Sequence, residues 1–143
     1  MIFDLDRFVV AQQTVYESVV SELRAGRKRG HWIWFIFPQL AGLGRSETSR
    51  YYGIASLNEA RGYLAHPILG SRLRECAGLV LAAPGPSAAD ILGVIDATKL
   101  RSSMTLFYRA EPREVIFAQV LNRFFDGEAD PVTDDLLARP REA

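Results

Sequence analysis

Three short segments place a basic side chain beside a small or hydroxyl residue, a combination typical of sites that hold anions. They are Arg27–His31, Gly44–Ser46 and Lys99–Ser103. Lysine and arginine donate hydrogen bonds from a positive group, whereas phosphate and carboxylate accept them on a negative one. We therefore expect a site for a small anionic molecule. Its candidate residues from these segments are Lys28, His31, Arg45, Ser46, Lys99, Ser102 and Ser103.

The segment around Ser46 offers backbone donors as well. Ser46 can begin a short helix, whose first N–H groups have no partner within the helix and attract anions. The aromatic run before it supplies flat surfaces on which a base or nicotinamide ring can stack. The alternative is structural: Ser46 only caps the helix, Arg45 pairs with Glu47, and the aromatic residues belong to the core. The further candidates are Trp32, Trp34, Gln39 and Tyr52.

Lys99, Ser102 and Ser103 lie three and four residues apart, which places them on one face of a helix. A lysine beside a serine can activate the hydroxyl for nucleophilic attack. However, the Ser-x-x-Lys order of serine acyl-enzymes is absent, because the lysine comes first here. Serines inside a helix also bond back to a carbonyl of the preceding turn. The sequence thus assigns no catalytic residue, and whether the protein is an enzyme stays open.

Histidine and cysteine offer little for metal binding. His31 and His66 do not have the spacing of zinc ligands, and Cys76 is the single cysteine. His66 precedes Pro67, where we expect it to cap a helix end. Cys76 falls on an apolar stripe and is expected to be a core thiol. We therefore predict no metal, no cofactor and no disulfide.

Helices must position these residues, because most apolar side chains recur at three- and four-residue steps. The expected fold is a single all-α domain, residues 1–143, with six to eight helices around the aromatic segment Trp32–Phe37. Residues 136–143 are expected to form a frayed acidic and polar tail. The helices that we predict cover residues 5–25, 46–53, 56–65, 68–82, 87–93, 96–107, 112–127 and 133–137.

The aromatic segment itself has no decisive pattern. Six apolar residues in a row suit a buried strand or a short buried helix, and Pro38 ends either one. No partner strand with clean alternation occurs elsewhere, so we favour a short helix or an extended insertion. Such a run must be enclosed by the rest of the chain.

Composition argues against several classes of partner. The 17 basic and 17 acidic residues balance, so no overall field attracts the protein to nucleic acid or membrane. The bases between Arg24 and Arg29 suit a solvated helix end better than a nucleic-acid patch. No signal peptide or membrane-spanning run is recognisable, and the cysteine content fits a reducing compartment. We expect a cytoplasmic protein that binds neither membrane nor nucleic acid.

Five segments form motifs long enough to point to a family: Lys28–Leu40, Gly42–Ser46, Tyr52–Ile54, Tyr63–Leu73 and Lys99–Phe107. They resemble domain-of-unknown-function family 1810, an uncharacterised bacterial family with members in mycobacteria and rhizobia. The resemblance covers residues 1 to about 138. It implies an all-α fold and no established activity. Leu92–Asp96 departs mildly from the family pattern, which often has Phe-Gly there, followed after a few residues by Asp. Some members are labelled calpastatin, a disordered inhibitor, whereas this chain is compact by composition.

Two functions follow from these residues. The first is binding of a small anionic molecule, nucleotide-like or similar to ADP-ribose, by a protein that can also be an enzyme. The second is a helical protein–protein interaction module without catalysis, which docks a protein partner through its arginine-rich helix ends. A pocket containing the polar candidates favours the first function. Polar candidates bonded among themselves, together with an exposed apolar patch, favour the second.

Overall fold

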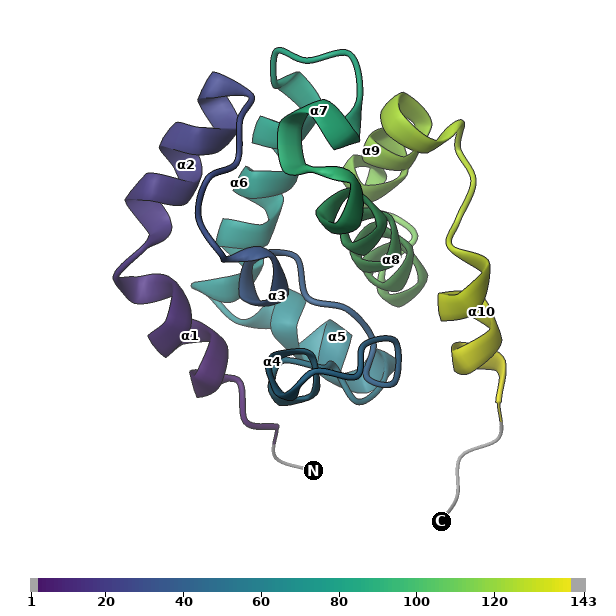
Figure 1. Cartoon of the computed structure of the whole chain (residues 1–143). Helices are drawn as coiled ribbons and strands as arrows, with labels where there is room; N and C mark the ends of the chain where they lie inside the picture. The colour runs from purple at the N-terminus through teal and green to yellow at the C-terminus, as the bar shows by residue number, and fades with distance from the viewer. Residues whose placement is uncertain (1–2, 140–143) are drawn as a thin grey trace.

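The computed structural model describes residues 3–139, and these residues form ten helices (Figure 1). The prediction of an all-α fold is confirmed, and the expected number of six to eight helices is corrected to ten. Within the described range no strand forms, and one isolated parallel bridge joins Leu40 to Ile54. The helices are α1 (Asp6–Gln13), α2 (Tyr16–Ala25), α3 (Ile33–Ile36), α4 (Glu47–Tyr51), α5 (Leu57–Ala65), α6 (Leu69–Ala82), α7 (Ala88–Leu92), α8 (Val94–Ala110), α9 (Val115–Phe125) and α10 (Pro131–Ala138).

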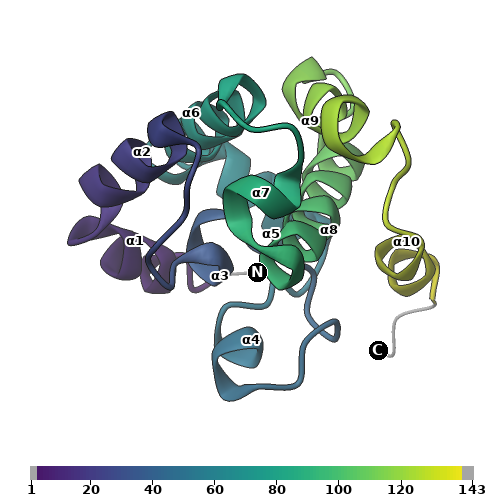
Figure 2. The same ribbon diagram turned by 45° about the horizontal axis from the view of Figure 1, so that its top comes forward.

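The helices surround one hydrophobic core. Helices α1 and α2 form one side of the molecule and α8, α9 and α10 the other, with α3 between them (Figure 1). A turn of 45° shows that α4 projects from the body and that α10 stands beside α8 (Figure 2). The core is one continuous cluster of buried side chains, and its largest members include Phe8, Tyr63, Phe107 and Phe117.

The predicted helix over residues 5–25 is two helices. Helix α1 ends at Gln13 and α2 begins at Tyr16, with the β-branched residues Thr14 and Val15 at the break. The apolar spacing continues across this break, so the pattern alone does not reveal it. The side chain of Gln12 turns into the core at the end of α1, where it donates 2.7 Å to the carbonyl oxygen of Phe35 and 3.0 Å to the hydroxyl of Tyr63. Tertiary contacts therefore determine where the helix is interrupted.

The aromatic segment contains a helix of one turn, α3, so the choice of a short helix is confirmed. Trp32, Ile33, Ile36 and Phe37 are at most 2% exposed, as the prediction of an enclosed run required. The enclosure is incomplete, because Trp34 and Phe35 are only half-buried. One turn of helix has too few internal hydrogen bonds to be stable alone. Its position therefore depends on the neighbouring helices.

Local caps begin and end several helices at or next to the predicted bounds. The Oγ atoms of Ser46, Ser56 and Ser87 each accept a hydrogen bond from the N–H three residues later. Gly26 ends α2 in the left-handed conformation, with φ of 73°. Three starts differ from the prediction, because α8 and α9 begin without a side-chain cap and the carboxylate of Asp130 caps α10. Helix α8 begins at Val94 instead of Asp96, α9 at Val115 instead of Pro112, and α10 at Pro131 instead of Thr133.

Part of the expected C-terminal tail is ordered structure. Residues 136–138 belong to α10, and Leu136 and Leu137 pack against the core. Polar contacts also hold α10 on α8: the guanidinium of Arg109 donates to both carboxylate oxygens of Asp134, 2.9 Å each. Residues 140–143 of that predicted tail lie outside the described residues.

Arg123 of α9 closes the end of α6. Its guanidinium donates to the carbonyl oxygens of Val80, Leu81, Ala83 and Gly85, at 2.5 to 3.1 Å. At the C-terminal end of a helix, the last carbonyl oxygens have no N–H partner within the helix. We expect Arg123→Met to reduce the free energy of unfolding by about 2 kcal/mol, because water replaces part of the lost bonding.

Thermal denaturation measures this as a fall in Tm of roughly 4–8 °C for a chain of this size. Arg113→Met is the control, since the exposed Arg113 side chain makes no hydrogen bond or ion pair within residues 3–139. Equal Tm values for the two variants would show that Arg123 does not stabilise the end of α6.

Candidate functional site

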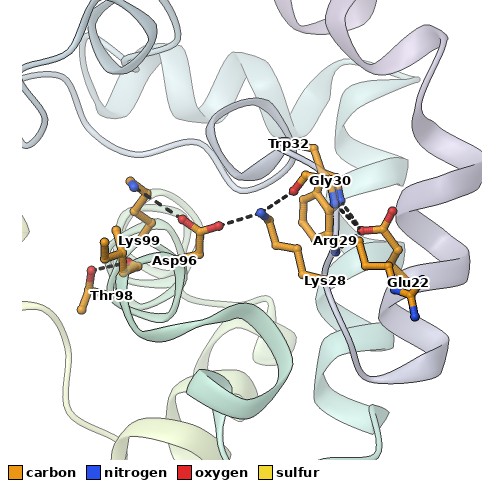
Figure 3. A network of polar contacts seen from close by, with 9 residues as sticks. Glu22, Lys28, Arg29, Gly30, Trp32, Asp96, Thr98 and Lys99 are labelled. Carbon is orange, nitrogen blue, oxygen red and sulfur yellow. Dashed lines mark hydrogen bonds and ion pairs between the residues drawn. The ribbon is translucent and has the colours of Figure 1, made fainter.

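Two lysines from distant parts of the chain meet at one carboxylate (Figure 3). The Nζ atom of Lys28 lies 2.7 Å from Oδ2 of Asp96, and Nζ of Lys99 lies 3.5 Å from Oδ1. Lys28 also donates to the carbonyl oxygen of Gly30 at 2.5 Å. The three charged side chains are 7 to 19% exposed. Their formal charges, +1, +1 and −1, leave one positive charge in a largely buried place.

The loop before α3 and the start of α8 bring these groups together. Gly26 turns the chain at the end of α2, and the backbone N–H of Lys28 donates 2.8 Å to the carbonyl oxygen of Ile91 in α7. Asp96 lies in the first turn of α8, where the helix dipole favours a negative charge. Lys99 follows three residues later on the same helix. The site therefore joins α3, α7 and α8.

The two tryptophans differ in how their indole N–H groups are satisfied. The Nε1 atom of Trp32 donates 3.0 Å to the carboxylate of Glu22, and this ring is 2% exposed. The Nε1 atom of Trp34 is buried but has no hydrogen-bond partner among the described residues. The ammonium of Lys99 lies 5.4 Å from the centre of the Trp34 ring, a cation–π distance. The indole N–H of Trp34 is therefore an unpaired donor in a ring that lies beneath the ammonium of Lys99.

The two predicted serines also differ. Ser102 donates 3.1 Å to the carbonyl oxygen of Thr98 and lies 3.1 Å from a carboxylate oxygen of Asp130, so it helps to dock α10. Ser103 is completely buried, and its Oγ has no hydrogen-bond partner within residues 3–139. Lys99 and Ser103 are four residues apart and share a face of α8. Lys99, on this face, lies over the ring of Trp34 in α3.

Five predicted candidates lie elsewhere. His31, Arg45 and Ser46 are exposed, and Ser46 caps α4 by accepting from the N–H of Ser49 at 3.1 Å. Gln39 is half-buried, and its backbone carbonyl accepts from Ile54 in the isolated bridge. Tyr52 stacks among Phe8, Phe35 and Tyr51, and burial raises the pKa of its hydroxyl. Of the eleven candidates, the structure brings Lys28, Trp32, Trp34 and Lys99 together at the junction of α3 and α8. Ser103 follows one helical turn after Lys99 on α8.

Sequence reasoning missed the two acidic residues that organise this junction. The sequence pattern places Asp96 only at the start of a predicted helix and gives Glu22 no role. A signal existed for Asp96, because an acid three residues before Lys99 on a helix can pair with it. No comparable signal existed for Glu22, whose partners in residues 29–32 become neighbours only after the chain turns at Gly26.

A cavity formed by other residues lies away from this junction. It has a volume of about 590 Å³ and lies between the isolated bridge, the start of α5 and α10. Its lining residues are Leu40, Ala41, Ala55, Ser56, Leu57, Asn58, Leu136, Leu137 and Arg139. None of the eleven candidates is among them, so this cavity is not the pocket of polar candidates that would favour anion binding.

The remaining reactive side chains have structural roles. Burial raises the pKa of the Cys76 thiol to about 12, which makes it a poor nucleophile near neutral pH. The Nδ1 atom of His66 accepts from the N–H groups of Ile68 and Leu69, so His66 caps the start of α6. Within the described residues no three His, Cys, Asp or Glu side chains are placed to hold a metal ion. In the same range, no helix has both the length and the apolarity needed to cross a membrane.

Comparison with known proteins assigns the family. The model of the family described as "Protein of unknown function (DUF1810)" matches residues 2–137. The chain is 55% identical to the crystal structure of the conserved hypothetical protein Rv1873 from Mycobacterium tuberculosis, with a TM-score of 0.94. That match covers 96% of this chain and 99% of the mycobacterial one. No curated protein matches the chain. With nearly its whole length matched, the chain belongs to the DUF1810 family of proteins of unknown function.

Proposed function

We propose that this protein binds a small anionic molecule at the junction of α3 and α8. The observation that supports this proposal is an excess of donors over acceptors. Lys28 and Lys99 share the single carboxylate of Asp96, and the N–H of Trp34 and the hydroxyl of Ser103 have no partner within residues 3–139. An anion supplies acceptors and the missing negative charge together. We call this set of five residues the lysine–tryptophan site.

A nucleotide-like ligand, such as one resembling ADP-ribose, fits the chemistry of these residues. The half-buried ring of Trp34 offers a face for a base, and Lys99 lies beside it for a phosphate. Lys28 has less freedom, because it is 7% exposed and already bonds to Asp96 and Gly30. Lys99 is therefore the residue that meets the ligand. Within residues 3–139 we assign no pair of groups as a nucleophile and its base, so the proposal is binding, without an assigned reaction.

Thermal-shift measurements against phosphate, AMP, NAD and ADP-ribose test this function. A ligand that binds only the folded protein stabilises it by about 2.7 kcal/mol at a hundredfold excess over Kd, which raises Tm by roughly 5–10 °C. We expect Lys99→Met to abolish the shift, since it removes the charge and keeps the stem over Trp34. Arg113→Ala, which removes an exposed cation in the turn before α9, should keep the shift.

Two results would contradict the proposal. The absence of a shift with every anion would remove the small-molecule function. A shift lost in Arg45→Ala but retained in Lys99→Met would move the site to the start of α4, where Arg45 and Ser46 are exposed.

Docking of a protein partner is the second candidate function. Val94 and Ile95 are 74% and 71% exposed at the start of α8, and the exposed bases Arg27 and Arg29 flank Lys28, whose N–H bonds to Ile91 in α7. Adjacent apolar and basic side chains are common at protein interfaces. This function becomes the favoured one when no anion raises Tm.

A further inference from the structure

Ser103 differs from the other buried hydroxyl residues of α8. Ser102 and Thr105 each donate to the carbonyl oxygen four residues earlier, at 3.1 and 2.8 Å. This is the usual way for a helix to satisfy a buried hydroxyl. Ser103 stands between them in sequence, is completely buried, and makes no such bond. A buried hydroxyl without a partner lowers stability, so its presence calls for an explanation.

A second unpaired donor lies on the facing helix. The Nε1 atom of Trp34 in α3 is buried and has no partner among the described residues. The ammonium of Lys99 lies over the Trp34 ring, 5.4 Å from its centre. Lys99 and Ser103 occupy successive turns on one face of α8. The two unpaired donors therefore belong to α3 and to the face of α8 that carries Lys99.

Resting on the proposed function, we infer that the hydroxyl of Ser103 and the indole N–H of Trp34 form the inner part of the lysine–tryptophan site and bind an oxyanion of the ligand. The group that they bind is a phosphoryl or carboxylate oxygen, because both side chains can donate to it. In the unliganded protein the Lys99 side chain lies over Trp34, and it changes position when the ligand binds. Its contact with Asp96 is 3.5 Å, longer than the 2.7 Å contact of Lys28, so Lys99 is the weaker-held of the two cations.

Stability and binding should respond in opposite directions to loss of these donors. Ser103→Ala removes a buried hydroxyl that makes no bond, so Tm should rise by roughly 3 °C. The same change should weaken binding of AMP by about tenfold or more, the effect of one hydrogen bond to a charged group. Trp34→Phe keeps a ring beneath Lys99 and removes Nε1, and should also weaken AMP binding. A purely structural role for Ser103 predicts no change in AMP affinity.

The control is Thr105→Val. Thr105 is equally buried on α8, but its hydroxyl donates to Arg101 and accepts from the N–H of Asp130 at 2.8 Å. Thr105→Val should therefore lower Tm and leave the affinity for AMP unchanged. Adenosine, which shares the base and ribose of AMP but has no phosphate, should bind wild type much more weakly than AMP.

The experiment is isothermal titration of wild type and the three variants with AMP, adenosine and inorganic phosphate, with Tm measured in parallel. Loss of AMP affinity in Ser103→Ala and Trp34→Phe, but not in Thr105→Val, supports the inference. AMP affinity that is unchanged in Ser103→Ala overturns it and leaves the proposed function intact. If neither AMP nor phosphate binds wild type, both the inference and the anion-binding function fail.

Discussion

Gly70→Ala is expected to destabilise the protein by about 3 kcal/mol, because α5 and α6 touch at this glycine. A Cβ at position 70 would lie 2.1 Å from the carbonyl oxygen of Leu64 and 2.9 Å from the carbon of that carbonyl. Both are backbone atoms at the end of α5, so no side-chain rotation relieves the overlap. The two helices must separate, and the core between them loses contact. Urea denaturation measures the loss as a lower midpoint with an unchanged slope.

A second glycine of α6 provides the matched control. Gly78 lies in the same helix, and a Cβ there has no neighbouring heavy atom within 4 Å. Gly78→Ala should therefore raise the free energy of unfolding by about 0.5–1 kcal/mol, since alanine favours the helix over glycine. Opposite signs for one substitution at two places in one helix identify the close approach as the cause. If Gly70→Ala is as stable as wild type, the end of α5 does not restrict the side chain at position 70.

The two glycines illustrate which part of the fold the sequence predicts. Caps are local, so Ser46, Ser56 and Ser87 mark helix starts correctly, and Gly26 marks a helix end. The approach of α5 to α6 is a tertiary contact between separate helices. Nothing in the sequence distinguishes Gly70 from Gly78. The same limitation explains why the break between α1 and α2, where Gln12 turns inward to Phe35, escaped prediction.

In the candidate site too, local features were predictable and tertiary contacts were not. Residue type alone identified Lys28, Trp34, Lys99 and Ser103, because cations, indoles and buried hydroxyls are recognisable without a fold. Their assembly was not predictable, since Lys28 and Lys99 meet only through Asp96 at the start of α8. Sequence grouped them instead with the exposed residues at the start of α4, because both sets place a base beside a hydroxyl.

Glu22→Ala is the second substitution with a large expected effect, since Glu22 holds the loop that carries Lys28. One carboxylate oxygen accepts from the N–H of Arg29 at 2.6 Å, the N–H of Gly30 at 2.9 Å and Nε1 of Trp32 at 3.0 Å. Its removal leaves three donors without this acceptor. We expect a loss of about 3 kcal/mol of stability and a fall in Tm of roughly 6–12 °C. Because the loop positions Lys28 and α3, any anion binding should weaken as well.

The dependence of this effect on pH tests its electrostatic origin. Burial alone would raise the pKa of the Glu22 carboxyl, but the hydrogen bonds from Arg29, Gly30 and Trp32 and the charge of Lys28 outweigh it and lower the pKa. A carboxyl with a lower pKa in the folded state stabilises the protein above its unfolded pKa of about 4.3. That contribution is lost as pH falls through the folded value. The stability gap between wild type and Glu22→Gln should thus be constant above about pH 5 and shrink at lower pH.

Glu17→Gln separates this effect from a general change in charge. Glu17 lies in the same helix and is exposed, and its side chain makes no hydrogen bond or ion pair within residues 3–139. Neutralising it should leave both the stability at pH 7 and its pH dependence close to those of wild type. Chemical denaturation of the three proteins between pH 3 and pH 8 makes the comparison. The stability difference between wild type and Glu22→Gln could instead be the same at every pH. The loop would then depend on the shape of the side chain at position 22, and the charge of Glu22 would not anchor the segment leading into α3.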